Sequence, residues 1–371
     1  MQHIHALRRG ATMSYALATL STISFSLLLG ACSTPPVRPQ AATERPTATA
    51  GETPAPALTP QMAQDAELLN RMASQLDRLY RVAAPLLINN VDLCKAQARN
   101  LLGFTAKNRY SYPGDYNEAA HVAFGMGEHL QVTGVLAGSG AAQAGLQRGD
   151  RLLTAGGKKL PTGANAPSTA GGVFGPLLTA TTSLPIGIER DGDKRSITVP
   201  VTRACGFGIE LGNADNVNAY NDGSRVMVTR GMLAFVRSDD ELAYLLATGM
   251  AHSLLGHPAS QRYAGTVGGI IDNLVKVEPD TSMLIGSGGI KAMSADTDIA
   301  ADRLALYLTA RAGYDIDGAA PFWKRLAANY PATVLNGFVA NHPATPARVA
   351  AMEKTTAEIK SKQSTKKTLM P

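Results

Sequence analysis

The chain has 371 residues, of which 45% are hydrophobic and 17% charged, which fits globular domains and excludes a protein that is disordered throughout. Its formal charge is +6, and removal of the leader described below takes away Arg8 and Arg9, which lowers the charge by two to +4. An excess this small and dispersed gives no reason to expect nucleic acid as a partner.

Residues 1–31 have the composition of a secretory leader. Arg8 and Arg9 precede an uncharged, largely apolar stretch that ends in Leu-Gly-Ala before Cys32. This order is typical of a signal peptide, and the ending resembles the bacterial lipobox. We therefore expect cleavage after residue 31 and lipidation of Cys32. A transmembrane anchor is the alternative, which the serine and threonine content of the apolar run disfavours.

The segment after the leader is expected to tether the protein to a membrane. Ser33 follows Cys32, and the lack of aspartate there resembles lipoproteins of the outer membrane of Gram-negative bacteria. Acyl methylenes buried in lipid contribute about 0.8 kcal/mol each. Residues 32–60 are mostly Pro, Ala and Thr and cannot form a core. The predicted location is the bacterial cell envelope, lipid-anchored to the outer membrane and facing the periplasm.

Two cysteines remain once Cys32 is lipidated, Cys94 and Cys205. An even pair in an oxidising compartment predicts a disulfide. The alternative is two separate buried thiols.

Residues 62–84 show apolar residues at helical spacing and predict a packing helix. The apolar stretch from Val82 to Val91 predicts a strand that leads to Cys94. A disulfide between Cys94 and Cys205 would then join the two points where the chain enters and leaves an insertion.

The insertion alternates strand, short helix and turn from Leu130 to Gly157 and resembles a PDZ domain of the bacterial protease-associated type. Such domains bind a peptide as an added strand, and a loop of backbone amides receives its C-terminal carboxylate. The loop is best matched by Phe124-Gly125-Met126-Gly127, and the apolar part of residues 173–178 would line the groove. A spacer whose groove is filled by its own chain is the alternative.

The run from Glu241 to His257 has the apolar spacing of a buried helix that carries His252 and His257. Ser238, three residues before a glutamate, has the pattern of a capping box and places the helix start near Asp239. The histidines are five residues apart, about 140° around an ideal helix, so we expect them not to face one ion together.

The segment from Asn218 to Ala243, which leads into this helix, resembles the corresponding part of the M48 zinc metallopeptidases. That family continues with H-E-x-x-H, two histidine ligands and a glutamate that activates the zinc-bound water. Here the motif reads Thr248-Gly249-Met-Ala-His252. The resemblance therefore implies one retained ligand, His252, and the loss of the first ligand and of the general base.

A second helix is expected from Asp296 to a stop at Gly313. In the family it begins with the third ligand, a glutamate, followed four residues later by an aspartate that orients a ligand histidine. Those positions hold Asp298 and Asp302. The resemblance makes Asp298 a metal ligand with a shorter side chain, and Asp302 a hydrogen-bond acceptor for His252.

A His-Pro pair and a downstream arginine follow the second helix in the family, and His342 and Arg348 resemble them. The resemblance implies that both lie behind the metal ligands, with His342 facing the cleft. A surface histidine before proline is the alternative.

Three further segments have simple expectations. Residues 258–294 are rich in glycine and apolar residues and either cover the cleft or form a packing hairpin. Trp323, the only tryptophan, is expected to pack the last helices. Lys360 to Lys367 is expected to be a solvated tail.

The predicted fold class is α+β: a zincin-like, mainly helical M48 peptidase domain with an inserted PDZ-like β domain. The expected divisions are a signal peptide at 1–31, a tether at 32–60, the first part of the M48-like domain at 61–108, the PDZ-like domain at 109–203, the rest of the M48-like domain at 204–358, and a basic tail at 359–371.

Two functions remain open. The favoured one is a catalytically impaired lipoprotein that binds polypeptide or a protein C-terminus through its cleft and PDZ-like unit, with no cofactor expected. General acid-base help contributes about a hundredfold to ten thousandfold in rate, and Gly249 cannot supply it. The alternative is an active zinc metalloendopeptidase with a substituted site built from His252, Asp298 and, in one version, His342.

Overall fold

A computed structural model describes residues 58–114, 116–257, 293–332 and 337–371. The leader, Cys32 and most of the tether lie outside the described residues, as does 258–292. Residues from Ala57 to Pro371 form one compact unit. In the part of the chain that the structure describes, no helix is both long and apolar enough to cross a membrane.

The first element is a long helix, α1 (Pro60–Ile88), whose N-cap Thr59 accepts a hydrogen bond from the Met62 amide. The helical prediction for 62–84 is confirmed. The strand predicted from Val82 onward is wrong, because α1 continues to Ile88 with Pro85 inside it. A short apolar run is compatible with a buried helix as well as a strand, and here its residues pack into the core.

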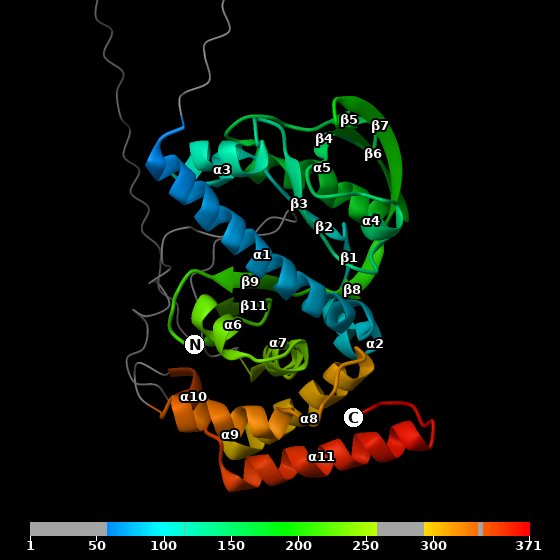
Figure 1. Cartoon of the computed structure of the whole chain (residues 1–371). Helices are drawn as coiled ribbons and strands as arrows, with labels where there is room; N and C mark the ends of the chain where they lie inside the picture. Colours follow the sequence, from blue (N-terminus) through cyan, green and yellow to red (C-terminus); the bar gives the residue numbers. More distant parts are fainter. Residues whose placement is uncertain (1–57, 115, 258–292, 333–336) are drawn as a thin grey trace, which may run out of the picture. The chain divides into compact units, whose positions relative to one another are not determined.

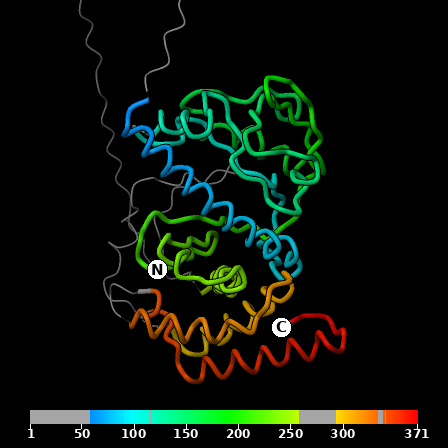
Figure 2. The backbone as a smooth tube through the Cα atoms, in the orientation of Figure 1, coloured from blue at the N-terminus to red at the C-terminus, as the bar shows by residue number. Residues whose placement is uncertain are grey.

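The chain enters and leaves the insertion side by side (Figure 2). After α2 (Val91–Cys94) and a 3-10 turn (Lys95–Gln97), strand β1 (Ala98–Leu101) pairs antiparallel with β8 (Thr202–Cys205). Cys94 and Cys205 form a disulfide with their Cα atoms 5.5 Å apart, which confirms that prediction. The crosslink joins the two crossings where they meet the core.

The inserted part is a β-rich unit with a hydrophobic cluster of its own (Figure 1). Its sheet has the order β2-β3-β4-β6-β7, with β5 paired to β4. Helix α5 packs on the sheet through Phe174 and Leu178. The sheet begins before the boundary expected between 108 and 109, because β2 pairs with β3.

The elements of this unit are β2 (Phe104–Lys107), a 3-10 turn (Arg109–Ser111), α3 (Tyr116–Phe124), β3 (Gln131–Val135), α4 (Gly140–Gln143), β4 (Arg151–Ala155), β5 (Lys158–Lys159), α5 (Ala166–Ala180), β6 (Ser183–Arg190) and β7 (Asp193–Pro200).

After β8 the chain forms a small sheet and then helices. The sheet order is β10-β11-β9, with β10 antiparallel and β9 parallel to the central strand β11. Helix α7 packs against β10, β11 and α8, while α11 packs against α8 and α9 (Figure 1). The largest hydrophobic cluster joins α1 to these elements.

The bounds in this region are β9 (Gly208–Gly212), β10 (Ala219–Asn221), β11 (Arg225–Thr229), α6 (Arg230–Phe235), α7 (Asp239–Leu254), α8 (Ala295–Arg311), α9 (Ala319–Asn329), α10 (Gly337–Asn341) and α11 (Pro346–Ser364).

Two predictions near the C-terminus fare differently. Trp323 is fully buried in α9, as expected. Residues 360–367 are exposed, as expected, apart from half-buried Lys362, but they are not a loose tail, because α11 continues to Ser364. The Lys362 ammonium donates hydrogen bonds to the Tyr307 hydroxyl and the Met370 carbonyl, and so holds the chain end near α8.

Candidate functional site

Helix α7 is built as its sequence predicts at the N-terminus and not at the C-terminus. Ser238 accepts a hydrogen bond from the Glu241 amide, and Glu241 reaches back to the Arg237 amide. The helix ends at Leu254, and Gly256 has a φ of +75°. His257 therefore lies beyond the helix, and the 140° separation expected from an ideal helix does not apply to it.

Thr248 and Gly249, at the family's positions for the first ligand and the general base, are packed against neighbouring residues. Thr248 is buried, and its Oγ1 donates to the Tyr244 carbonyl at 2.9 Å. A Cβ placed on Gly249 would lie 2.8 Å from Cγ1 of Val226 on β11. Ordinary carbon contacts are about 3.5–4.0 Å, so any side chain at position 249 would press against Val226.

One side of α7 carries a buried cluster that can offer metal ligands. His252, Asp298 and His342 each present one donor atom, and these atoms lie within 4.8 Å of one another. His342 Nδ1 donates to Asp298 Oδ1 at 2.8 Å, and its Nε2 accepts from Asn341 at 3.2 Å. His342 is buried in this cluster and therefore does not lie on the surface.

His252 uses only one of its two ring nitrogens. Its Nδ1 lies 3.0 Å from Nδ1 of His257, a hydrogen-bond distance. Among the described residues its Nε2 has no hydrogen-bond partner, and it lies 3.6 Å from Asp298 Oδ1. Burial, together with the charges of His342, His257 and Arg348, lowers the pKa of His252 to about 2. The imidazole is therefore neutral at physiological pH, as a metal ligand must be.

Asp302 does not accept a hydrogen bond from His252, which corrects the expected role. Its two oxygens are engaged by Arg348, with Nε to Oδ2 at 2.6 Å and Nη2 to Oδ1 at 2.9 Å. Tyr244 donates to the same carboxylate at 2.8 Å, and Trp323 Nε1 donates to the Tyr244 hydroxyl. Asp302 thus stabilises the packing of α7, α8, α9 and α11.

Arg348 joins this network to the ligand cluster. It is 1% exposed, its guanidinium lies 3.9 Å from the Trp323 ring centroid, and Nη1 donates to the His342 carbonyl. Nη1 also lies 3.7 Å from Asp298 Oδ2. Hydrogen bonds and ion pairing with Asp302 outweigh desolvation and raise its pKa well above the usual range. Arg348 therefore connects Asp302 with His342 and Asp298.

The donor atoms of these residues suit a metal ion, but the site lacks the base that hydrolysis needs. Two imidazoles and a carboxylate are suitable zinc ligands, and the unpaired Nε2 of His252 faces the carboxylate. A bound ion would supply Lewis-acid polarisation there. In the described residues around the cluster, Gly249 stands where a base is needed, and Asp298 already accepts from His342 and lies beside Arg348.

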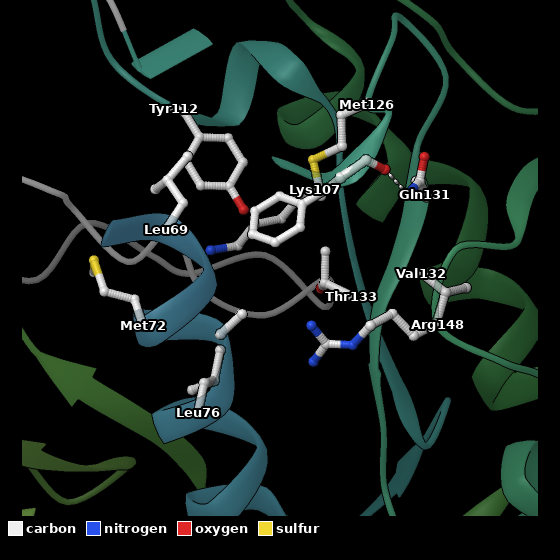
Figure 3. Close-up of a pocket in the computed structure, with 12 residues that line it drawn as sticks. Leu69, Met72, Leu76, Lys107, Tyr112, Met126, Gln131, Val132, Thr133 and Arg148 are labelled. Atoms are coloured by element: carbon white, nitrogen blue, oxygen red, sulfur yellow. Dashed lines mark hydrogen bonds between the residues drawn. The ribbon is translucent and has the colours of Figure 1, made fainter. Parts of the chain in front are cut away.

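The residues predicted to bind peptide, Phe124 to Gly127, form the connection between α3 and β3. Phe124 and Met126 line a cavity of about 50 Å³ whose far wall is α1 (Figure 3). Gln131 donates to the Phe124 carbonyl, and Arg109 donates its amide to the Gly127 carbonyl. This loop therefore faces α1.

The cavity is apolar with positive charge at one side. Leu69, Met72 and Leu76 of α1 line it, as do Lys107 and Arg148 of the β-rich unit (Figure 3). Burial raises the pKa of Tyr112, which also lines it, to about 12, although Arg148 opposes the shift. Residues of α1, residues between 107 and 133, and Arg148 thus line one cavity although they are far apart in the sequence.

Filling this void should stabilise the fold. Ala73 lines it on α1, and Ala73→Leu is expected to raise the free energy of unfolding by about 1 kcal/mol, because the added methyl groups leave water for an apolar wall. Urea titration measures the change. Ala63→Leu, at an exposed position of the same helix, is the control and should change stability by less than about 0.5 kcal/mol. Destabilisation by Ala73→Leu alone would show that no usable space exists there.

Sequence reasoning missed the contacts of Val226 and His257. Val226 is an ordinary β-branched strand residue, and only its contact with Gly249 makes it part of the site. The glycine after Leu255 was an available signal, since glycine frequently ends a helix in a left-handed conformation.

A family comparison covers the residues of the ligand cluster. Residues 195–356 match the model of peptidase family M48. The matched range includes α7, α8 and the start of α11, and with them every residue of the ligand cluster. No curated protein matches the chain. Residues 195–356 therefore form a domain of peptidase family M48.

Proposed function

We propose that this protein is a polypeptide-binding, non-hydrolytic member of the M48 family, anchored by a lipid in the bacterial envelope. The contact between Gly249 and Val226 carries the first half of the proposal. A glutamate at position 249 would meet a buried strand residue, so the chain lacks both the base and the space for one. Family membership gives the scaffold and does not by itself give the chemistry.

The second half rests on the β-rich unit, which we propose to be PDZ-like. Strand β2 is at one end of its sheet, and an extended peptide can add to such an edge. The Phe124–Gly127 connection is the candidate contact for a C-terminal residue. Its cavity offers apolar walls and is also lined by Lys107 and Arg148, and a peptide carboxylate would have to compete with Asp77 for Arg148. At about 50 Å³ it suits a small apolar side chain.

An active zinc endopeptidase is the second candidate, and one observation favours it. The buried His252, Asp298 and His342 cluster could hold a metal without the family's first histidine. Hydrolysis would then need a base from outside the described residues. The observed loss at 249 makes this the weaker of the two.

The purified full-length chain can decide between these functions. It is expected to leave a reduced, unfolded protein substrate intact with or without added zinc, and to bind fluorescent peptides that end in a small apolar residue. Peptides with an amidated C-terminus should bind at least tenfold more weakly, because they lack the carboxylate. Cleavage that a chelator abolishes would refute the non-hydrolytic half of the proposal.

Matched variants test the binding half. Ala73→Leu fills the cavity and should weaken peptide binding, whereas Ala63→Leu should not. Equal affinity for free and amidated C-termini, or equal binding by both variants, would remove the cavity from the proposal.

A further inference from the structure

Arg148, which lines the cavity beside α1, already has a carboxylate partner within the chain. Its Nη2 donates a hydrogen bond to Asp77, in an ion pair whose side chains are 40% and 49% exposed. The guanidinium charge reaches the cavity, because it opposes the rise in the pKa of Tyr112, another lining residue. A group that could receive a ligand carboxylate is therefore occupied by a carboxylate of the protein itself.

Asp77 lies at the edge of the face of α1 that lines the cavity. Leu69, Met72 and Leu76 line it at helical spacing (Figure 3), as does Ala73, which is four residues before Asp77. With 49% of its side chain exposed, Asp77 can turn into water without becoming a buried charge. Exposed ion pairs are weak, so this one can be exchanged readily for another.

The backbone that carries Arg148 is held in place, so a change of partner needs to move only the side chain. The Asp150 carboxylate accepts a hydrogen bond from the Gln147 amide at 2.8 Å. Asp150 is 1% exposed and accepts two further hydrogen bonds of 2.6 Å from Nε and Nη2 of Arg190. The turn on both sides of Arg148 is thus fixed by a buried carboxylate, and the guanidinium stands on a rigid base.

We propose that Asp77 is a built-in competitor of the peptide carboxylate. Asp77 holds Arg148 when no ligand is bound, and the C-terminal carboxylate of a peptide displaces it in the same kind of charge-assisted hydrogen bond. Ligands that also fill the apolar walls gain enough to bind, whereas small carboxylates do not. The proposal rests on the proposed peptide binding at this cavity and adds the residue that regulates it.

Competition of this kind sets the size of the effect. The apparent affinity of a ligand falls by the fraction of protein in which its site is free. An exposed ion pair is strong enough to lower that affinity about twofold to sixfold. Removal of the Asp77 charge should restore this factor for peptides with a free C-terminal carboxylate. Amidated peptides have no group to compete with Asp77, so their affinity should not change.

Binding of fluorescent peptides to the full-length chain tests Asp77. Asp77→Asn keeps the size of the side chain and removes its charge. It should bind peptides that end in a small apolar residue with a free carboxylate about twofold to sixfold more tightly than the parent does, and amidated peptides equally well. Glu67→Gln is the matched control, because it removes a carboxylate from an exposed ion pair with Arg71 on the same helix. It should bind as the parent does, and an equal gain in both variants would replace the competitor by a general effect of net charge.

A double-mutant cycle assigns the gain to Arg148. In a protein that carries Arg148→Met, the further change Asp77→Asn should no longer tighten binding, and a gain that persists there would overturn the proposal. If the parent prefers free to amidated peptides and Asp77→Asn gives no gain, Asp77 is no competitor and the peptide site still stands. Equal binding of free and amidated peptides by both the parent and Asp77→Asn, or no binding by either protein, would overturn the competitor and the peptide site together.

Discussion

Gly249→Glu is expected to lower the free energy of unfolding by about 3–5 kcal/mol. The new Cβ would lie 2.8 Å from Val226 Cγ1, and overpacking of this kind costs about 1–3 kcal/mol. The carboxylate would add the cost of a buried charge without a partner. Replacing glycine in a helix returns only about 1 kcal/mol. Urea unfolding followed by circular dichroism gives the difference.

A helical glycine with free space provides the control. Gly172 lies in α5, is exposed, and has nothing within 4 Å of an added Cβ. Gly172→Glu should therefore be neutral or stabilising. Adding Val226→Ala to Gly249→Glu should recover at least about 1 kcal/mol, because it removes the clashing methyl groups. If Gly249→Glu is as stable as the parent protein, β11 is free to move and the closed site is wrong.

The same contact predicts the outcome of rebuilding the family motif. Thr248→His together with Gly249→Glu should not yield a stable peptidase while Val226 remains. The histidine would also displace a hydroxyl that is bonded to Tyr244. The packing around positions 248 and 249 thus fits threonine and glycine, and it does not fit the family's histidine and glutamate.

Arg348→Met is expected to destabilise the protein by about 3–5 kcal/mol. The substitution leaves Asp302, which is 1% exposed, as a buried charge without its bidentate partner. It also removes the stacking of the guanidinium on Trp323 and the bond to the His342 carbonyl. Chemical unfolding of the two proteins at neutral pH gives the value.

A double-mutant cycle separates the ion pair from simple packing. Arg348→Met with Asp302→Leu should cost less than the sum of the single changes, since neither charge is then left alone. Additive losses would show that the two charges do not interact. Lys324→Met, which breaks an exposed pair with Glu353, is the control and should cost less than about 1 kcal/mol.

The helices were predictable because their signals are local. Thr59, Ser238 and Ser294 each accept a hydrogen bond from an amide three residues later, at the start of α1, α7 and α8. Periodic apolar residues give the rest of each helix. The disulfide was predictable by counting cysteines.

The errors occurred where a distant contact decides the outcome. Val82 to Ile88 has the apolar character of a strand, and its burial against the core makes it the last part of a helix. Asp302 is the residue type that the family has at this position, but its hydrogen bonds are made with Arg348 and Tyr244. His257 was placed by helical geometry that stops at Leu254. No local pattern shows that Val226 approaches Gly249.

Helix α1 takes part in two hydrophobic clusters. Leu69, in its first half, packs with residues of α3, while Leu79 and Leu86 pack in the main core, and the disulfide follows the C-terminal end of α1. Loss of either cluster would expose one half of a helix that the other half holds in place. The β-rich unit and the family domain should therefore unfold in a single cooperative transition, and strain applied at one end of α1 is transmitted mechanically to the other.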